Sequence, residues 1–217
     1  MTYNTVIFDM DGTVLNTLED LKDSVNYALH QMGYPSRTLD EIRRFVGNGS
    51  RLLIERAVPA GTTKEDCNKC LEIYSKYYAT NNQNKTKPYD GIIDLLKELK
   101  DRKYKLAIVS NKFDSSVKVL CRNYYNEYIK VAIGESQNVA KKPAPDSVFT
   151  AIKELGSKVE QSIYVGDSDV DVETAHNAGI KCVGVTWGFR TRETLLNAGA
   201  DYIIDNPVEL IPILANT

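Results

Sequence analysis

A short apolar run that ends in two aspartates is the feature that most constrains this chain. Residues 6–8 are Val, Ile and Phe, a composition typical of a buried β-strand. Asp9 and Asp11 follow, and side chains two apart on an extended chain share a face. Gly12 then allows a sharp turn. Because two close carboxylates repel each other unless a cation lies between them, the stretch predicts a Mg²⁺ site, with a solvated Asp-Gly turn as the alternative.

Composition and charge narrow the class of protein. The chain has 217 residues, 42% of them hydrophobic, and a formal net charge of −2. This content suffices for a substantial core, and the charge indicates neither a nucleic-acid nor a membrane partner. The start of the chain lacks signal-peptide features, so a cytoplasmic location is expected, as a monomer or a homodimer. We expect the four cysteines to be free thiols of a reducing compartment, although Cys67 and Cys70 have the spacing of half a zinc site.

Residues 16–82 have the apolar periodicity of a small helical bundle. Capping boxes are predicted at Thr17–Asp20 and Thr38–Glu41, and Ser50 is expected to cap the third helix. The helices themselves are predicted over residues 18–32, 39–46, 51–58 and 64–78. A polar, aperiodic stretch then follows as a linker.

The rest of the chain alternates between helices and strands. Asp90 and Pro207 are expected to begin helices, and further strands are predicted over residues 106–109, 128–133, 163–165, 182–185 and 202–204. This alternation predicts an α/β fold with a doubly wound, Rossmann-like parallel sheet. Residues 1–15 and 83–217 would form this core, and residues 16–82 an inserted helical domain.

Polar side chains follow several of the predicted strands at the point where each strand ends. In open α/β sheets, ligands bind beyond the carboxyl ends of the strands. Carboxylates there suit a metal, whereas a hydroxyl, an amide and an ammonium suit the oxygens of a phosphoryl group. Taken singly, each group could equally be a turn, a helix cap or a solvated charge. The groups are Asp9, Asp11, Ser110, Asn111, Lys142, Asp167, Asp169 and Asp171.

These residues resemble the four motifs of the haloacid dehalogenase superfamily of aspartate-nucleophile phosphatases, over almost the whole chain. The motifs are Asp9-x-Asp11-Gly12-Thr13, Ser110-Asn111, Lys142-Pro143 and Gly166-Asp167-Ser168-x-x-Asp171. More narrowly, residues 45–49, 165–179 and 187–192 are similar to the phosphoglycolate phosphatase group. The inserted helices look like that superfamily's mobile cap, although this chain departs from the group at Asn16-Thr17 and at Tyr89-Asp90-Gly91.

The resemblance implies a Mg²⁺-dependent hydrolase of a small phosphorylated metabolite. Asp9 would be the nucleophile and Asp11 the general acid and base. Mg²⁺ would be held by Asp9, Asp167 and the main-chain carbonyl of Asp11, while Asp171 would support Asp167. The expected phosphate-binding groups are Thr13, Ser110, Asn111 and Lys142.

Arg51 and the choice of substrate are the open points. Arg51 follows a flexible Gly-Asn-Gly turn, and we expect it to bind an anionic substrate such as phosphoglycolate, the alternative being a solvated side chain between two helices. A pyrophosphatase, a 5′-nucleotidase or a sugar phosphomutase could use the same scaffold. A phospho-receiver domain also combines clustered Asp, a hydroxyl, Lys and Mg²⁺, but it would be shorter. A catalytically idle binding protein is disfavoured because every required group is present.

Overall fold

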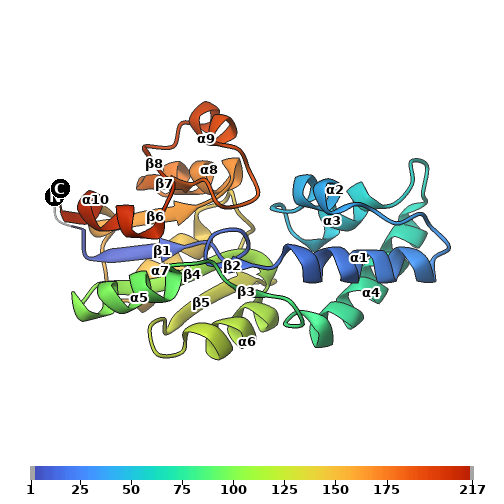
Figure 1. Ribbon diagram of the computed structural model, residues 1–217, viewed down its shortest axis with the longest axis horizontal. Coiled ribbons are helices and arrows are strands. Elements are labelled where there is room, and N and C mark those ends of the chain that lie inside the picture. The colour runs from blue at the N-terminus through green and yellow to red at the C-terminus, as the bar shows by residue number, and fades with distance from the viewer. Residues whose placement is uncertain (1–2, 216–217) are drawn as a thin grey trace.

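A parallel sheet of six strands, in the order β5-β4-β1-β6-β7-β8, forms the centre of the computed structural model, which describes residues 3–215 (Figure 1). The central strand β1 pairs Phe8 with Ile108 of β4 on one side and with Val165 of β6 on the other. The residues that follow these three strands therefore lie side by side at one edge of the sheet. The strands are β1 (Thr5–Phe8), β4 (Lys105–Phe113), β5 (Val131–Glu135), β6 (Ser162–Gly166), β7 (Lys181–Val185) and β8 (Tyr202–Ile204).

Both faces of the sheet are covered by helices, which confirms the predicted doubly wound α/β fold. Alternate residues of β1 take part in two separate apolar cores, Val6 and Phe8 on one face and Ile7 on the other. The first core includes residues of α5 (Ile92–Asp101), α6 (Asp114–Tyr125) and α10 (Leu210–Ala215). The second includes residues of α7 (Asp146–Glu154), α8 (Asp169–Asn177) and α9 (Arg192–Ala198). Short 3-10 turns lie at η1 (Val159–Gln161) and η2 (Pro207–Glu209).

Four further helices form a group to one side of the sheet, which we call the helical lobe (Figure 1). They are α1 (Leu18–Gln31), α2 (Leu39–Phe45), α3 (Ser50–Ala57) and α4 (Lys64–Asn81). A third apolar core lies among these helices, and in the part of the chain that the structure describes Phe189 is its one buried residue from outside the lobe. The lobe therefore has a core distinct from those of the sheet.

Two short antiparallel strands, β2 (Leu15–Asn16) and β3 (Lys87–Pro88), connect the helical lobe with the sheet. Asp20 holds this connection together. Its buried carboxylate accepts hydrogen bonds from the main-chain N–H groups of Lys85, at 3.0 Å, and Thr86, at 2.8 Å. The capping box predicted at Thr17–Asp20 is wrong, because Thr17 makes no side-chain cap and Asp20 is committed to the returning chain.

Several other local predictions can be compared with the structure. The box at Thr38–Glu41 is confirmed, with both of its hydrogen bonds present. Ser50 and Asp90 are not caps, because the glycines beside them, Gly49 and Gly91, occupy the N-cap positions. The strand predicted over residues 128–133 lies three residues later at its start, and Pro207 begins a 3-10 turn ahead of α10. The four cysteines are buried and free. Within residues 3–215 no helix is long and apolar enough to cross a bilayer.

Candidate active site

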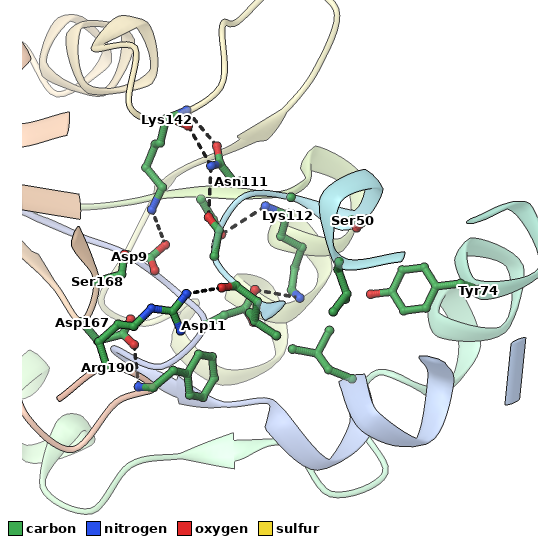
Figure 2. A pocket seen from close by; sticks show the side chains of 17 residues that line it. Asp9, Asp11, Ser50, Tyr74, Asn111, Lys112, Lys142, Asp167, Ser168 and Arg190 are labelled. Atoms are coloured by element: carbon green, nitrogen blue, oxygen red, sulfur yellow. Dashed lines mark hydrogen bonds and ion pairs between the residues drawn. The ribbon is translucent and has the colours of Figure 1, made fainter. Parts of the chain in front are cut away.

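A pocket between the edge of the sheet and the helical lobe collects most of the predicted site residues (Figure 2). Its volume is about 40 Å³. The sheet side contributes the predicted acids and phosphate-binding groups, and the lobe contributes apolar side chains and hydroxyl groups. From the sheet side come Asp9, Asp11, Ser110, Asn111, Lys112, Lys142, Asp167, Ser168, Phe189 and Arg190; from the lobe come Leu21, Val46, Gly47, Gly49, Ser50, Leu53 and Tyr74.

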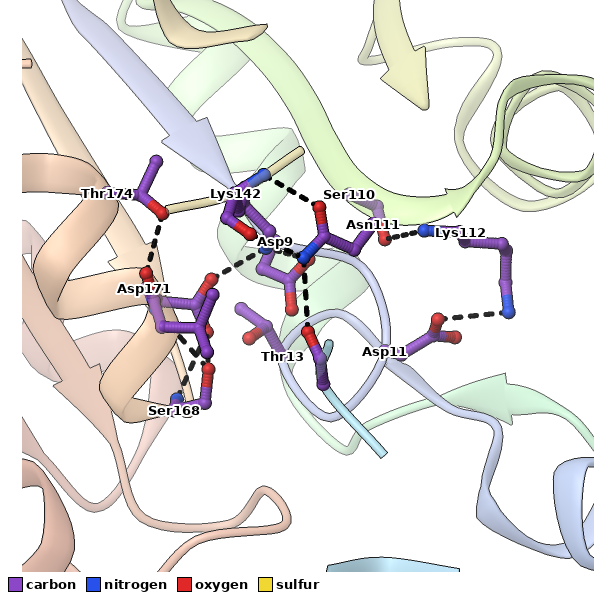
Figure 3. Close-up of polar contacts among 12 residues, drawn as sticks. Asp9, Asp11, Thr13, Ser110, Asn111, Lys112, Lys142, Ser168, Asp171 and Thr174 are labelled. Atoms are coloured by element: carbon purple, nitrogen blue, oxygen red, sulfur yellow. Dashed lines mark hydrogen bonds and ion pairs between the residues drawn. The ribbon is translucent and has the colours of Figure 1, made fainter. Parts of the chain in front are cut away.

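Lys142 lies at the centre of a buried hydrogen-bond network (Figure 3). Its ammonium donates to Asp9 Oδ1 at 2.8 Å, to Asp171 Oδ1 at 2.7 Å and to the Tyr164 hydroxyl at 3.2 Å. Tyr164 in turn donates to Asp171 Oδ1 at 3.1 Å. All three N–H donors of the ammonium therefore have acceptors, which holds Lys142 in one position beside Asp9.

Asp167 is held by the turn after β1 and by the loop after β7. Its Oδ1 accepts from the Thr13 hydroxyl at 3.2 Å, and its Oδ2 accepts from the Phe189 main-chain N–H at 2.7 Å. Both turns approach so closely that only glycine fits: a Cβ would lie 2.4 Å from Asp167 Oδ2 at Gly12 and 2.2 Å from Asp167 Cβ at Gly188. Gly12 also has a φ of +88°, which L side chains rarely adopt.

The buried carboxylates have more negative charge than the network neutralises. Oxygen atoms of Asp9, Asp167 and Asp171 all lie within 4.8 Å of one another. Among the described residues, the Lys142 ammonium pairs with Asp9 and Asp171, and Asp167 forms no ion pair. Burial, with the charge of Asp171 added, raises the pKa of Asp9 to about 7 despite the opposing effect of Lys142. Burial and the charges of Asp171 and Asp9 raise the pKa of Asp167 well above its usual value. A divalent cation would relieve this excess, and an all-oxygen donor set suits Mg²⁺.

Asp11 lies apart from that cluster and faces the helical lobe. Its Oδ2 forms an ion pair with Lys112 Nζ at 2.9 Å, whereas its Oδ1 is buried and has no hydrogen-bond partner among residues 3–215. Lys112 also donates to the Tyr78 hydroxyl at 2.7 Å. Figure 2 shows Asp11 and Lys112 pointing toward each other. Asp11 therefore holds one oxygen fixed and one oxygen free to exchange a proton with a ligand.

Ser110 and Asn111 both lie near the carboxyl end of β4, but their side chains make different contacts. The Ser110 hydroxyl accepts the Lys112 main-chain N–H at 3.3 Å, and its own proton is available to a ligand. The Asn111 side chain pairs with both the N–H and the carbonyl of Lys142, at 2.8 and 3.0 Å, and donates to the Gly47 carbonyl of the lobe at 3.3 Å. Asn111 thus fixes the position of the Lys142 loop through hydrogen bonds and also contacts the lobe.

The structure does not bring every predicted residue into the pocket. Arg51 lines a different cavity, where it donates to Asn68 Oδ1 at 2.9 Å and lies 3.8 Å from Glu55 Oε1.

Two cations that sequence reasoning missed line the pocket instead. Lys112 comes directly after the Ser110-Asn111 motif, and β4 continues through it with a register shift that the apolar pattern did not indicate. Arg190 comes from a loop that the sequence had singled out without a role, and it donates to the Arg43 and Val46 carbonyls at 2.8 and 2.6 Å.

Comparison with known proteins identifies the family to which this chain belongs. The family model of haloacid dehalogenase-like hydrolases matches residues 6–185. Phosphoglycolate phosphatase 1 of Pseudomonas aeruginosa is 30% identical over 95% of this chain and 78% of its own length. Phosphoglycolate phosphatase of Aquifex aeolicus is 29% identical over 97% of this chain and 96% of its own length.

Solved structures agree with these matches. One from Lactobacillus delbrueckii subsp. bulgaricus has a TM-score of 0.93 at 34% identity and covers 99% of both chains. CbbY of Rhodobacter sphaeroides, solved in complex with phosphate, has a TM-score of 0.75 at 26% identity over 97% of this chain and 96% of its own. The chain belongs to the haloacid dehalogenase-like hydrolase family. Within that family it is a phosphatase, that is, a phosphoric monoester hydrolase, so the receiver-domain and binding-protein alternatives do not apply.

Proposed function

We propose that this phosphatase is Mg²⁺-dependent, works through an aspartyl-phosphate intermediate and hydrolyses phosphoglycolate. The observation that supports this proposal most is that Asp9 and Asp11 line the same pocket but have different hydrogen-bond partners. Asp9 is bonded to Lys142 beside a carboxylate cluster, and Asp11 has a buried, unpartnered oxygen. These surroundings support a role for Asp9 in attacking a phosphoryl group and a role for Asp11 in exchanging protons.

In the proposed reaction an Asp9 carboxylate oxygen attacks phosphorus, and the bond from phosphorus to the leaving alcohol breaks. Asp11 gives the proton that the alcohol needs, through its unpartnered Oδ1. Asp11 then takes a proton from the water that attacks the aspartyl-phosphate, which releases inorganic phosphate and regenerates Asp9. Such acid–base assistance contributes about 10²–10⁴-fold in rate.

The charged oxygens of the phosphoryl group would be held by the Ser110 hydroxyl and the Lys142 ammonium. Asn111 and Thr13 would act by holding Lys142 and Asp167 in place, as their hydrogen bonds suggest. Mg²⁺ would be held by Asp9 and Asp167, with Asp171 or the Asp11 main-chain carbonyl as a further ligand. When bound, the ion would offset the repulsion between the carboxylates and an anionic substrate.

The helical lobe is the proposed cap domain of residues 16–82, with residues 1–15 and 83–217 as the core. Leu21, Leu53 and Tyr74 of the lobe cover the pocket, so closure would exclude water from the reacting groups. The lobe contacts the core through polar groups such as Arg190 and Asn111 that could separate and re-form. These contacts support a lobe that opens for substrate and closes for chemistry.

Phosphoglycolate is favoured by the pocket and by the relatives. The pocket volume of about 40 Å³ has room for only a few waters, which suits a small leaving group better than a nucleoside. Lys112 and Arg190 supply positive charge beside the pocket. Pyrophosphate and a sugar bisphosphate also carry anionic leaving groups, so a pyrophosphatase and a phosphomutase remain the alternatives to test.

A panel of phosphate esters with Mg²⁺ tests the proposal. Phosphoglycolate, pyrophosphate, a 5′-nucleotide and a hexose phosphate are compared by kcat/KM for phosphate release. We expect phosphoglycolate to rank first, with no release in the presence of a chelator. A higher rank for pyrophosphate or the nucleotide would overturn the substrate assignment. Transfer of phosphate between sugar positions without release would overturn hydrolysis.

A further inference from the structure

Lys112 is a buried cation at the pocket that the proposed chemistry does not use. Its side chain is only 4% exposed, and it lies on β4 two residues after Ser110. The Tyr78 ring of the helical lobe lies over the ammonium, 4.6 Å from nitrogen to ring centroid. A buried ammonium is costly unless its donors are used, so its position beside Asp11 needs a reason.

The number of N–H donors already in use distinguishes Lys112 from Lys142, the other buried lysine of the pocket. Lys142 uses its three N–H groups on Asp9, Asp171 and Tyr164. Arg190 differs in another way, because its guanidinium is tied to the main-chain carbonyls of Arg43 and Val46 in the lobe and lies 3.7 Å from Asp169 Oδ1. Lys112 has two acceptors, Asp11 Oδ2 and the Tyr78 hydroxyl, and across residues 3–215 no third acceptor contacts it. One N–H of Lys112 is therefore left for a ligand.

The position of Lys112 relative to Asp11 indicates which ligand group it fits. In an ester of a 2-hydroxy acid, one carbon atom separates the leaving oxygen from the carboxylate. The residue that protonates the leaving oxygen and the residue that binds the carboxylate must therefore be neighbours. Lys112 Nζ lies 2.9 Å from Asp11 Oδ2, and both residues line the pocket. Apolar side chains such as Leu21 and Leu53 line the same space and would strengthen a charge-assisted hydrogen bond there.

We propose that Lys112 is the specificity-determining residue that binds the carboxylate of the leaving group, with Tyr78 of the lobe holding its ammonium in place. The substrate class is then phosphate esters whose alcohol carbon bears a carboxylate. This inference rests on the proposed function, since it assigns the residue that selects phosphoglycolate. It also replaces Arg51, which lies outside the pocket, as the cation that binds the substrate's anionic end.

The test compares phosphoglycolate with 2-hydroxyethyl phosphate, in which a hydroxymethyl group replaces the carboxylate. The measured quantity is the ratio of kcat/KM for the two substrates, in the wild type and in Lys112→Met. Any damage to Asp11 lowers both rates together and cancels in the ratio. We expect Lys112→Met to lower the preference for phosphoglycolate about 10²-fold, the order expected for one charge-assisted hydrogen bond. Lys112→Arg should restore part of that preference.

Two further variants complete the design. Tyr78→Phe removes the hydroxyl but keeps the ring, and it should lower the preference several-fold in the same direction even if Lys112→Met does not fold. Arg51→Met, a cation outside the pocket, should leave the preference unchanged. A wild type without any preference for phosphoglycolate would overturn the proposed substrate. A wild type with that preference, unaltered in Lys112→Met and Tyr78→Phe, would overturn the Lys112 assignment alone.

Discussion

The carboxylate cluster at the edge of the sheet and the helical lobe that faces it are stabilised in opposite ways. The cluster buries Asp9, Asp167 and Asp171 with one lysine, an arrangement that costs free energy until a cation binds. The lobe is held by an apolar core, and its ion pairs, such as Lys76–Glu72, are on the surface and contribute little. The comparison supports the proposal that residues at the edge of the sheet carry out the chemical step, whereas the lobe shapes the pocket.

The largest expected effect is on the nucleophile. Asp9→Asn removes the attacking oxygen but keeps the size of the side chain and an acceptor for Lys142. We expect phosphate release to fall by about 10⁴-fold or more, measured as kcat with saturating Mg²⁺. The thermal midpoint should stay within a few degrees, which serves as the control for folding. Turnover near the wild-type rate would contradict the role assigned to Asp9.

The second prediction tests the electrostatic cost of the cluster. The pKa of Asp9 is raised from 3.8 to about 7 by burial, so its contribution to stability is complete below pH ~4 and is lost as pH rises through ~7. Without metal, the free energy of unfolding should fall by about 1.4 kcal/mol between pH 6 and pH 8, or about 3–6 °C in thermal midpoint. Mg²⁺ should raise the midpoint more at pH 8 than at pH 6. Equal effects at both pH values would contradict a metal site at these carboxylates.

A smaller effect is expected at the contact between the two regions. Arg190→Met removes the donors to the Arg43 and Val46 carbonyls of the lobe. If docking of the lobe encloses the substrate, KM for phosphoglycolate should rise about 10-fold, the order expected when hydrogen bonds to a charged group are lost. The value of kcat should change less. A fall in kcat alone, at constant KM, would instead place Arg190 in the chemical step.

The smallest effect is expected at Arg51. Its guanidinium bonds to Asn68 in a separate cavity. Arg51→Ala should leave KM for phosphoglycolate within about twofold of the wild type, as is usual for a surface side chain without a ligand contact. A large rise in KM would show that the lobe can turn Arg51 toward the pocket, and the sequence-based expectation would then hold.

Most of the fold could be predicted from the sequence because its signals are local. The continuous apolar run of residues 6–8 and the helical period in residues 18–32 arise from neighbouring residues. The capping box at Thr38–Glu41 is likewise a contact within one turn. A local pattern gave a wrong prediction where a distant segment offered another hydrogen-bond partner. The Asp20 carboxylate accepts a hydrogen bond from the main chain 65 residues later and forms no capping box with Thr17.

The sequence by itself determined that acids, a hydroxyl, an amide and a lysine follow strands of one parallel sheet, because strand ends of such a sheet meet at one edge. Only the tertiary structure decided how these groups pair: Lys142 with Asp9 and Asp171, and Asp11 with the unpredicted Lys112. It also decided that Arg51 points away while Arg190 reaches the lobe. Pairing depends on packing between segments up to 133 residues apart, and no local pattern contains that information.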